Sequence, residues 1–302
     1  MSRIREALKK AALERDAQQG GRTTQELVEL AGENLVREVA SELVQTSSVR
    51  TVEAPPPPFP ADYERLLKKC QRTMGKIDPR HSVFVDEAVE PGGAEKFRTL
   101  RSRLYQITAT RPLKRVLVTS SLPAEGKTFI AANLAQSIIR QENRRVLLID
   151  GDLRAPRLHH PFGAAAGPGL SDYLLGNSDE FGIIQVGDAP NLCLIAAGQH
   201  VSNPSEILHS KAMENLLERL GPLFDWVILD SPPAIAVHDS SLLADICDGV
   251  LFVVKAGQTD FEIAQDALEK FDEKKLLGVV LNRVQKLDGY ASYYAAYPRP
   301  QD

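Results

Sequence analysis

Short apolar runs alternate with helix-length segments between about residue 81 and residue 285. The runs are rich in Val, Ile and Leu, and they read RVLVTS, VLLID, LCLIAA, DWVILD, GVLFVV and GVVLN. Continuous apolar runs of this length are typical of strands that are buried on both faces of a parallel sheet. The pattern predicts an α/β domain over 81–285, with a mostly parallel sheet flanked by helices.

The residues before this domain follow a different pattern. Apolar positions recur at spacings of three to five within 24–45, at Leu27, Leu30, Ala31, Leu35 and Val39, as expected of a helix. The run TVEAPPPPFPAD follows, and its consecutive prolines favour an extended spacer. The stretch DYERLLKKCQRTM is again helical in pattern. We therefore expect a helical N-terminal extension over 1–50 and a proline-rich linker with a short helix over 51–80.

The segment 286–302 has no apolar periodicity and is expected to be a flexible C-terminal tail. The chain has 7 tyrosines, and several of them gather in this segment: Tyr290, Tyr293, Tyr294 and Tyr297. Aromatic packing of a C-terminal segment would favour a regular apolar stripe, which is absent.

Charge and composition narrow the class of protein. The formal charge is −4, from 36 basic and 40 acidic residues, which gives no reason to expect a nucleic-acid partner. The 3 cysteines are widely spaced and suit neither a disulfide framework nor a metal cluster. No run approaches the 18 or so apolar residues of a membrane span, and the start, MSRIREALKK, has no apolar signal-peptide core. The sequence thus predicts a cytoplasmic protein.

The stretch VTSSLPAEGKT, residues 118–128, ends a strand and opens a helix. A helix N-terminus with free N–H groups binds phosphate, Lys127 is placed to reach the β- and γ-phosphates, and Thr128 to ligate Mg²⁺. The usual phosphate-loop pattern has a glycine where Ser121 stands. The residues expected to line the nucleotide are Pro123, Ala124, Glu125, Gly126, Lys127, Thr128 and Phe129.

Two acidic motifs stand at the ends of later strands. Asp150 and Asp152 follow the run LLI, and Asp230 ends the run VIL before two prolines. If the strand geometry persists, Asp150 and Asp152 face one space, where a cation or a shared proton is expected. An acidic residue at the position of Asp230 typically holds Mg²⁺, directly or through water. Each motif alone fits a helix cap or turn carboxylate, but together with the phosphate loop they predict a nucleotide site.

With these motifs the chain resembles the bacterial protein-tyrosine kinases that accompany capsule and exopolysaccharide synthesis. The likeness runs from about Phe84 to the C-terminus and rests on SSLPAEGKT, LLIDGDLR, VILDSPP, GQHVSNPSEIL and the tyrosine-rich tail. It implies a P-loop NTPase fold like that of the ParA/MinD ATPases. Those ATPases carry an extra lysine where Leu122 stands here, whereas the kinases lack it and have a proline like Pro123. This difference favours a kinase.

The resemblance implies ATP as phosphoryl donor, a tyrosine hydroxyl as acceptor, and Mg²⁺. We expect Asp150 to act as base, Lys127 to neutralise charge on the γ-phosphoryl oxygens, and Thr128, Asp152 and Asp230 to hold Mg²⁺. The spacing alone does not decide which of Asp150 and Asp152 is the base.

Two further residues carry open alternatives. Arg154 completes a D-x-D-x-R pattern and is expected either to contact phosphate or to pair with an aspartate. Asn282 follows the last strand and is expected either to contact adenine or to cap the strand end.

The stretch EKFRTLRSRL resembles the E-x-x-R-x-x-R oligomerisation helix of the same kinases. On a helix, Phe97, Leu100 and Leu104 share one face. Beside that face runs a second set of positions, Glu95, Arg98 and Arg101, here called the charged stripe. Composition alone predicts a solvated face with one i, i+3 ion pair. The resemblance favours a subunit contact that closes a ring and presents one tail to the next active site.

The partners that the resemblance implies are further copies of this chain, a membrane adaptor in trans and a tyrosine phosphatase. It also implies recruitment to the inner face of the plasma membrane, and control of exopolysaccharide polymerisation and export. The alternative functions are a ParA/MinD-type ATPase and a nucleotide-binding scaffold with weak catalysis.

Overall fold

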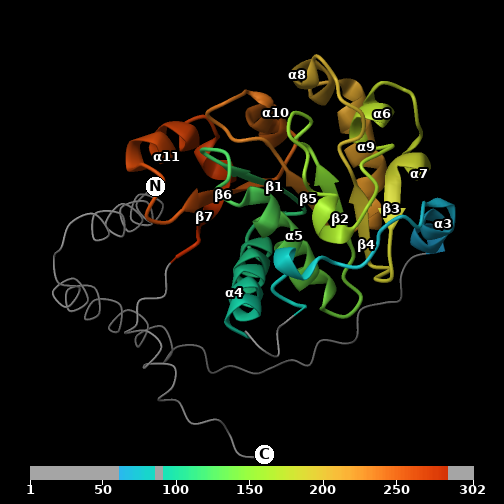
Figure 1. The fold of residues 1–302 in the computed structure, drawn as a ribbon, viewed down its shortest axis with the longest axis horizontal. Helices are drawn as coiled ribbons and strands as arrows, with labels where there is room; N and C mark the ends of the chain where they lie inside the picture. The colour runs from blue at the N-terminus through green and yellow to red at the C-terminus, as the bar shows by residue number, and fades with distance from the viewer. Residues whose placement is uncertain (1–60, 86–90, 285–302) are drawn as a thin grey trace, which may run out of the picture.

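A seven-stranded sheet with helices on both faces forms the body of the protein (Figure 1). The computed structural model describes residues 61–85 and 91–284. The strand order is β3-β4-β2-β5-β1-β6-β7, and every neighbouring pair is parallel except β3 with β4. The strands are β1 Arg115–Ser120, β2 Val146–Asp150, β3 Ile184–Val186, β4 Leu192–Ile195, β5 Trp226–Asp230, β6 Gly249–Lys255 and β7 Leu276–Asn282.

The sequence predicted all of these strands except β3. That strand is only 3 residues long and lies at the edge of the sheet, antiparallel to β4. Its short sequence, IQV, is broken by Gln185 and does not form an apolar run. The predicted α/β architecture with a mostly parallel sheet is confirmed.

Helices cover the sheet on both sides. They are α3 Ala61–Lys69, α4 Pro91–Thr108, α5 Lys127–Ile139, α6 Leu170–Leu174, α7 Glu180–Ile183, α8 Pro204–Leu208, α9 Lys211–Leu220, α10 Asp239–Asp245 and α11 Phe261–Leu268. Single 3₁₀ turns lie at Pro79–His81, His160–Phe162, Gly221–Leu223 and Glu273–Lys275. None of the helices within the described ranges is long and apolar enough to cross a membrane.

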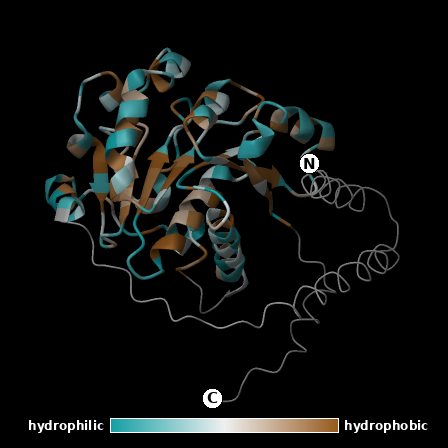
Figure 2. Ribbon diagram, turned by 180° about the vertical axis from the view of Figure 1, so that it is seen from behind, coloured by the Kyte–Doolittle hydropathy of each residue, from teal (hydrophilic) through white to brown (hydrophobic). Residues whose placement is uncertain are grey.

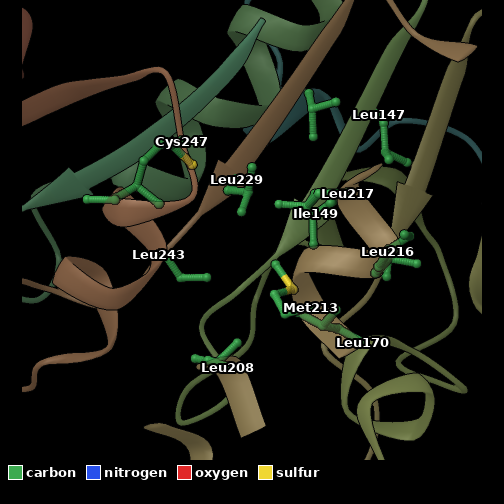
Figure 3. Packing of buried hydrophobic residues seen from close by; sticks show 14 of the residues in the cluster. Leu147, Ile149, Leu170, Leu208, Met213, Leu216, Leu217, Leu229, Leu243 and Cys247 are labelled. Carbon is green, nitrogen blue, oxygen red and sulfur yellow. The ribbon is translucent and has the colours of Figure 1, made fainter. Parts of the chain in front are cut away.

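Two hydrophobic clusters hold these layers together, one on each face of the sheet. Successive residues of a strand point to opposite faces, so Val116 and Val118 pack with α4 and α5, whereas Leu117 packs on the other side. Figure 3 shows the second cluster, where Leu216 and Leu217 of α9 meet the strands of the sheet. Figure 2 shows the strands as almost wholly hydrophobic, whereas the helices over them also carry hydrophilic residues. This contrast is the expected result of burying both faces of a parallel sheet.

The segment 61–85 packs against the domain, and its helix α3 lies within the stretch 51–80, for which the sequence predicts a linker with a short helix. Tyr63 is fully buried, and its ring meets that of Phe224 edge-on at a centroid distance of 5.4 Å. Gln71 forms a parallel bridge with Gln185, where the Val186 N–H donates to the Gln71 carbonyl oxygen at 2.9 Å. The stretch around Gln71 therefore covers the β3 edge of the sheet, whereas Ser82 and Val83 bond to side chains of α5.

Several predicted features lie outside the described residues. They are the helical extension over 1–50, the proline run, and the tail tyrosines Tyr290, Tyr293, Tyr294 and Tyr297. The three cysteines all lie within the described part, and all are free thiols, with Cys193 and Cys247 buried.

Candidate nucleotide and phosphoryl-transfer site

The loop between β1 and α5 turns sharply at the carboxyl edge of the sheet. Gly126 has φ 100° and Ala124 has φ 63°, both in the left-handed region. A Cβ on Gly126 would lie 2.0 Å from Nδ2 of Asn282, so only glycine fits there. Helix α5 begins at the next residue, Lys127. A turned loop that leads into a helix N-terminus directs free N–H groups at an anion, as the sequence predicts for phosphate.

The side chain of Glu125 stabilises the conformation of this loop. Its side chain is buried, with 2% of the residue exposed. One carboxylate oxygen accepts the N–H of Leu122 at 2.7 Å, and the other accepts the hydroxyl of Thr259, which lies between β6 and α11. The loop shape therefore depends on a residue far away in the sequence, and this role of Glu125 was not predicted. Its contact with nucleotide remains a prediction.

The other predicted loop residues have distinct surroundings. Pro123 and Ala124 are exposed at the tip of the loop. Phe129, on the first turn of α5, packs its ring against that of Phe97 from α4 at a centroid distance of 6.1 Å. Phe129 thus joins the phosphate loop to the helix that carries the charged stripe.

The acidic motifs meet the start of α5, as their strand positions predict. Strands β2 and β5 are adjacent, and Asp150 and Asp230 are register partners. Nζ of Lys127 donates to Oδ2 of Asp152 at 2.9 Å, and the hydroxyl of Thr128 donates to Oδ2 of Asp230 at 2.5 Å. The three aspartates are 0%, 3% and 1% exposed, so their charges lie in a medium where water screens little.

Burial and crowding shift the titration of these groups. Burial raises the pKa of Asp150, and the neighbouring Asp230 raises it further. Burial also raises the pKa of Asp230, although Lys127 and Thr128 oppose that shift. Burial lowers the pKa of Lys127, but Asp230 and Asp152 outweigh this effect, so its pKa lies above the ordinary value. Three crowded carboxyls beside one ammonium thus favour either a bound proton or a cation at this site.

The residues present fit a magnesium ion that arrives with a nucleotide. Oδ1 of Asp230 is buried and has no hydrogen-bond partner, next to the oxygen that accepts from Thr128. Within residues 61–85 and 91–284, no three His, Cys, Asp or Glu side chains group into an all-protein metal site. Mg²⁺ typically binds through one or two carboxylates, with waters and substrate phosphates completing its octahedral shell. Thr128, Asp152 and Asp230 supply oxygen ligands of that kind.

Both residues with open alternatives have partners inside the protein. Arg154 donates from Nε to Oδ2 of Asp239 at 2.7 Å and from Nη2 to Oδ1 at 3.1 Å. It therefore pairs with an aspartate, and its contact with phosphate remains a prediction. Nδ2 of Asn282 donates to the carbonyl oxygen of Glu125 at 2.8 Å, so Asn282 holds the phosphate loop at the strand end. Its contact with adenine also remains a prediction.

Sequence reasoning missed Asp239. It lies at the first position of α10, where an acidic residue usually indicates only a helix start. Its partner Arg154 is 85 residues away in the chain, and no local pattern links the two.

The three residues of the charged stripe have different surroundings in the structure. Nη1 of Arg98 lies 2.6 Å from Oε2 of Glu95, in an ion pair whose side chains are 37% and 67% exposed. Arg101 turns toward α5 instead, where it donates to the carbonyl oxygen of Ser137 at 2.5 Å. On the adjacent face, where the sequence places Phe97, Leu100 and Leu104 together, Phe97 and Leu104 are buried and Leu100 is half-buried. The stripe thus combines an exposed ion pair with an arginine that ties α4 to α5.

Comparisons with known proteins agree with this geometry. Residues 117–299 match the family described as the CobQ/CobB/MinD/ParA nucleotide binding domain. The tyrosine-protein kinase YwqD of Bacillus subtilis is 36% identical over 202 residues, which cover 66% of this chain and 84% of that protein. The tyrosine-protein kinase ptk of Acinetobacter johnsonii is 32% identical over 194 residues, but the match spans only 26% of its length.

A solved structure supports the same relationship. The chimerical protein CapA2B2 superposes with a TM-score of 0.64 at 31% identity, covering 74% of this chain and 99% of that one.

Proposed function

This chain belongs to the bacterial protein-tyrosine kinases with a CobQ/CobB/MinD/ParA nucleotide-binding domain, and we propose that it phosphorylates its own C-terminal tyrosines with ATP. The acceptors are Tyr290, Tyr293, Tyr294 and Tyr297. The observation that carries the proposal is that Asp152 and Asp230 contact Lys127 and Thr128, the first two residues of the helix that follows the phosphate loop.

Phosphoryl transfer needs alignment and charge neutralisation more than covalent help. The N–H groups at the start of α5 and the ammonium of Lys127 bind and orient the phosphates. Mg²⁺, when bound, supplies further neutralisation on the phosphate oxygens, and Thr128, Asp152 and Asp230 would hold it. The burial of the three aspartates supports this role, because electrostatic interactions are strong where water is excluded.

Asp150 suits the role of base. A tyrosine hydroxyl has a pKa near ~10 and is mostly neutral at pH 7, so a group that takes its proton assists transfer. The pKa of Asp150 is raised by burial and by Asp230, and a raised pKa makes a carboxylate a better proton acceptor. Asp152 is engaged with Lys127 at 2.9 Å, which favours it as the residue beside the metal and phosphates.

Incubation of the full chain with ATP and Mg²⁺ tests the proposal. The expected result is phosphotyrosine on the C-terminal segment, detected by antibody and located by mass spectrometry. A ParA/MinD-type ATPase would release phosphate without phosphotyrosine, and a scaffold would bind ATP with neither product. A variant with all four tail tyrosines replaced by phenylalanine is the matched control.

We also propose that transfer occurs between subunits of a ring, through a contact that includes the charged stripe. Each phosphate adds about −1.5 to −2 charges at pH 7, so four modified tyrosines add roughly −6 to −8 to each chain. These charges would lie close to Asp150, Asp152 and Asp230 of a neighbour. Repulsion should then drive the subunits apart, and a tyrosine phosphatase would restore assembly.

Sizing chromatography of phosphorylated, dephosphorylated and mutant chains tests the ring. Replacement of Glu95, Arg98 and Arg101 by alanine should give a monomer that binds ATP but phosphorylates its tail slowly. Because Arg101 packs on α5, the double variant with Glu95→Ala and Arg98→Ala separates surface contact from internal packing. Identical elution of every form would remove the ring, though not the kinase chemistry.

The wider setting that we propose is control of exopolysaccharide polymerisation and export. In this setting a membrane adaptor recruits the kinase to the inner face of the plasma membrane. The proposal rests on the family resemblance. Its test is the rate of tail phosphorylation with and without the cytoplasmic segment of a candidate adaptor, and an unchanged rate would remove the adaptor as an activator.

A further inference from the structure

The loop after β2 and the first turns of α8 and α10 are linked by one buried carboxylate. Asp239, at the start of α10, accepts from Arg154 on both of its oxygens, at 2.7 and 3.1 Å. The hydroxyl of Ser205, on the first turn of α8, donates to Oδ1 of the same carboxylate at 2.5 Å. Arg154 also donates to the Ser205 hydroxyl at 3.1 Å. We call these three side chains the Asp239 cluster.

The burial of Asp239 makes this cluster strong. Its side chain is 0% exposed, whereas that of Arg154 is 39% exposed. A buried carboxylate is costly unless it is paired and hydrogen-bonded, and a bidentate contact with a guanidinium adds directional constraint as well as charge. Asp239 therefore restrains where Arg154 can lie. An acidic residue at a helix start often serves only the helix, but here both oxygens accept from side chains of other segments.

Arg154 belongs to the loop that carries Asp152. Oδ1 of Asp152 accepts the N–H of Ala155 at 3.0 Å, and Oδ2 accepts from Lys127 at 2.9 Å. Arg154 stands between these two anchored residues, Asp152 and Ala155, in sequence. The anchored guanidinium and the Ala155 N–H bond therefore both restrain the short backbone segment that carries the Asp152 carboxylate.

We propose that Asp239 is a positioning residue for phosphoryl transfer, because through Arg154 it holds the loop that sets Asp152 against Lys127. The inference rests on the proposed place of Asp152 in the site. Misplacement of a reacting group by about 1 Å costs on the order of 10²-fold in rate. Loss of the Asp239 cluster should thus lower kcat and leave the binding of ATP by the phosphate loop largely intact.

The experiment compares Asp239→Asn, Arg154→Gln and the double variant, with tail phosphorylation of the full chain measured at saturating ATP. Each single variant should lower kcat by about 10- to 100-fold, with KM for ATP changed by less than about twofold. The double variant should be no slower than the slower single variant, because both substitutions break the same link. It should also be more stable than Arg154→Gln, which leaves a buried carboxylate without its partner.

Asp225→Asn is the matched control. Asp225 pairs with Arg145 at 3.1 Å near the opposite edge of the sheet, so its loss should reduce stability but not kcat. The proposal is overturned if kcat in Asp239→Asn falls no further than in this control, or if the two single effects multiply in the double variant. A rise in KM for ATP confined to Arg154→Gln would assign Arg154 to the phosphates and likewise overturn it. Wild-type transfer by Lys127→Met would instead refute the site itself.

Discussion

Two ion pairs of similar length lie in contrasting parts of the molecule. Lys127 and Asp152 are 2.9 Å apart and their side chains are 13% and 4% exposed. Arg98 and Glu95 are 2.6 Å apart and their side chains are 37% and 67% exposed. The shorter contact is not the one whose loss destabilises the fold more. An exposed pair typically contributes about 0.2–1 kcal/mol, whereas removal of one partner from a buried pair typically costs about 3–5 kcal/mol.

The difference teaches that surroundings, more than distance, give an ion pair its role. Lys127 is surrounded by Asp150, Asp152 and Asp230, which raise its pKa despite its burial. That arrangement is costly for folding and suited to binding polyphosphate and a cation. The pair on α4 has water as an alternative partner, and so it is suited to recognition of another surface, where water is readily replaced.

Lys127→Met should have the largest effect. Transfer of phosphate to tyrosine should fall by at least roughly 10³-fold, because a buried cation aimed at developing charge is lost. Phosphotyrosine formed per minute, measured with ATP binding and circular dichroism, checks this outcome. Lys96→Met, an exposed lysine on α4, is the control and should behave as wild type. Normal phosphorylation by Lys127→Met would contradict the assigned phosphate site.

Asp150→Asn and Asp152→Asn should come next, with unequal effects. The first should lower turnover by about 10²- to 10³-fold while Mg²⁺-dependent ATP binding persists, since a base acts in the chemical step. The second should weaken Mg²⁺-dependent binding as well. Titration of Mg²⁺ at fixed ATP, together with single-turnover rates, separates the two. Wild-type rates in both variants would make the second acidic motif structural.

The acidic cluster should also govern stability against pH. Burial and Asp230 raise the pKa of Asp150 in the folded state. The stabilisation of the folded state by proton binding to Asp150 is therefore fully present below the unfolded pKa of ~4. It is lost as pH rises through the higher folded value. Without nucleotide or metal, Asp150→Asn should therefore be more stable than wild type at pH 8, with a smaller gain at pH 5. Denaturant unfolding at both pH values measures this. A gain that shrinks as pH rises would contradict the raised pKa.

Arg101→Ala should have a smaller effect on the stability of the folded chain. It removes the donor to the Ser137 carbonyl oxygen, and a hydrogen bond from a charged group contributes about 1.5–3 kcal/mol when it is well shielded. Because Arg101 is only half-buried, we expect a loss of about 1 kcal/mol. Urea unfolding measures it, with the exposed Arg103→Ala as the control. Equal stability of the two variants would show that the contact with α5 contributes little.

Glu95→Ala should have the smallest effect. An i, i+3 ion pair on a helix surface contributes about 0.2–0.5 kcal/mol, and less at high salt. Unfolding in low salt and in 1 M salt should thus differ from wild type by no more than this amount. A loss of unfolding free energy above about 1.5 kcal/mol would show that the exposed pair contributes as much as a buried one. That result would contradict the difference between the two pairs.

The features that the sequence predicted correctly depend on residues close together in the chain or on the ends of strands. The apolar runs identify six of the strands because burial on both faces leaves little freedom in composition. Asp150 and Asp230 converge because parallel strands bring their carboxyl ends to the same edge. The phosphate loop is recognised because a left-handed turn before a helix requires glycine at Gly126. Strand β3 escaped detection because a three-residue edge strand has too few positions to form a pattern.

The sequence by itself determined the class of fold, the phosphate loop and the set of acidic residues, because each depends on neighbours in the chain or on strand ends. Tertiary structure decided what three long polar side chains contact. Glu125 meets Thr259 across 134 positions, Arg154 meets Asp239 across 85, and Arg101 meets Ser137 across 36. A long polar side chain can reach several partners. The choice among them follows from which elements pack together and which carboxylates are buried too deeply to remain unpaired.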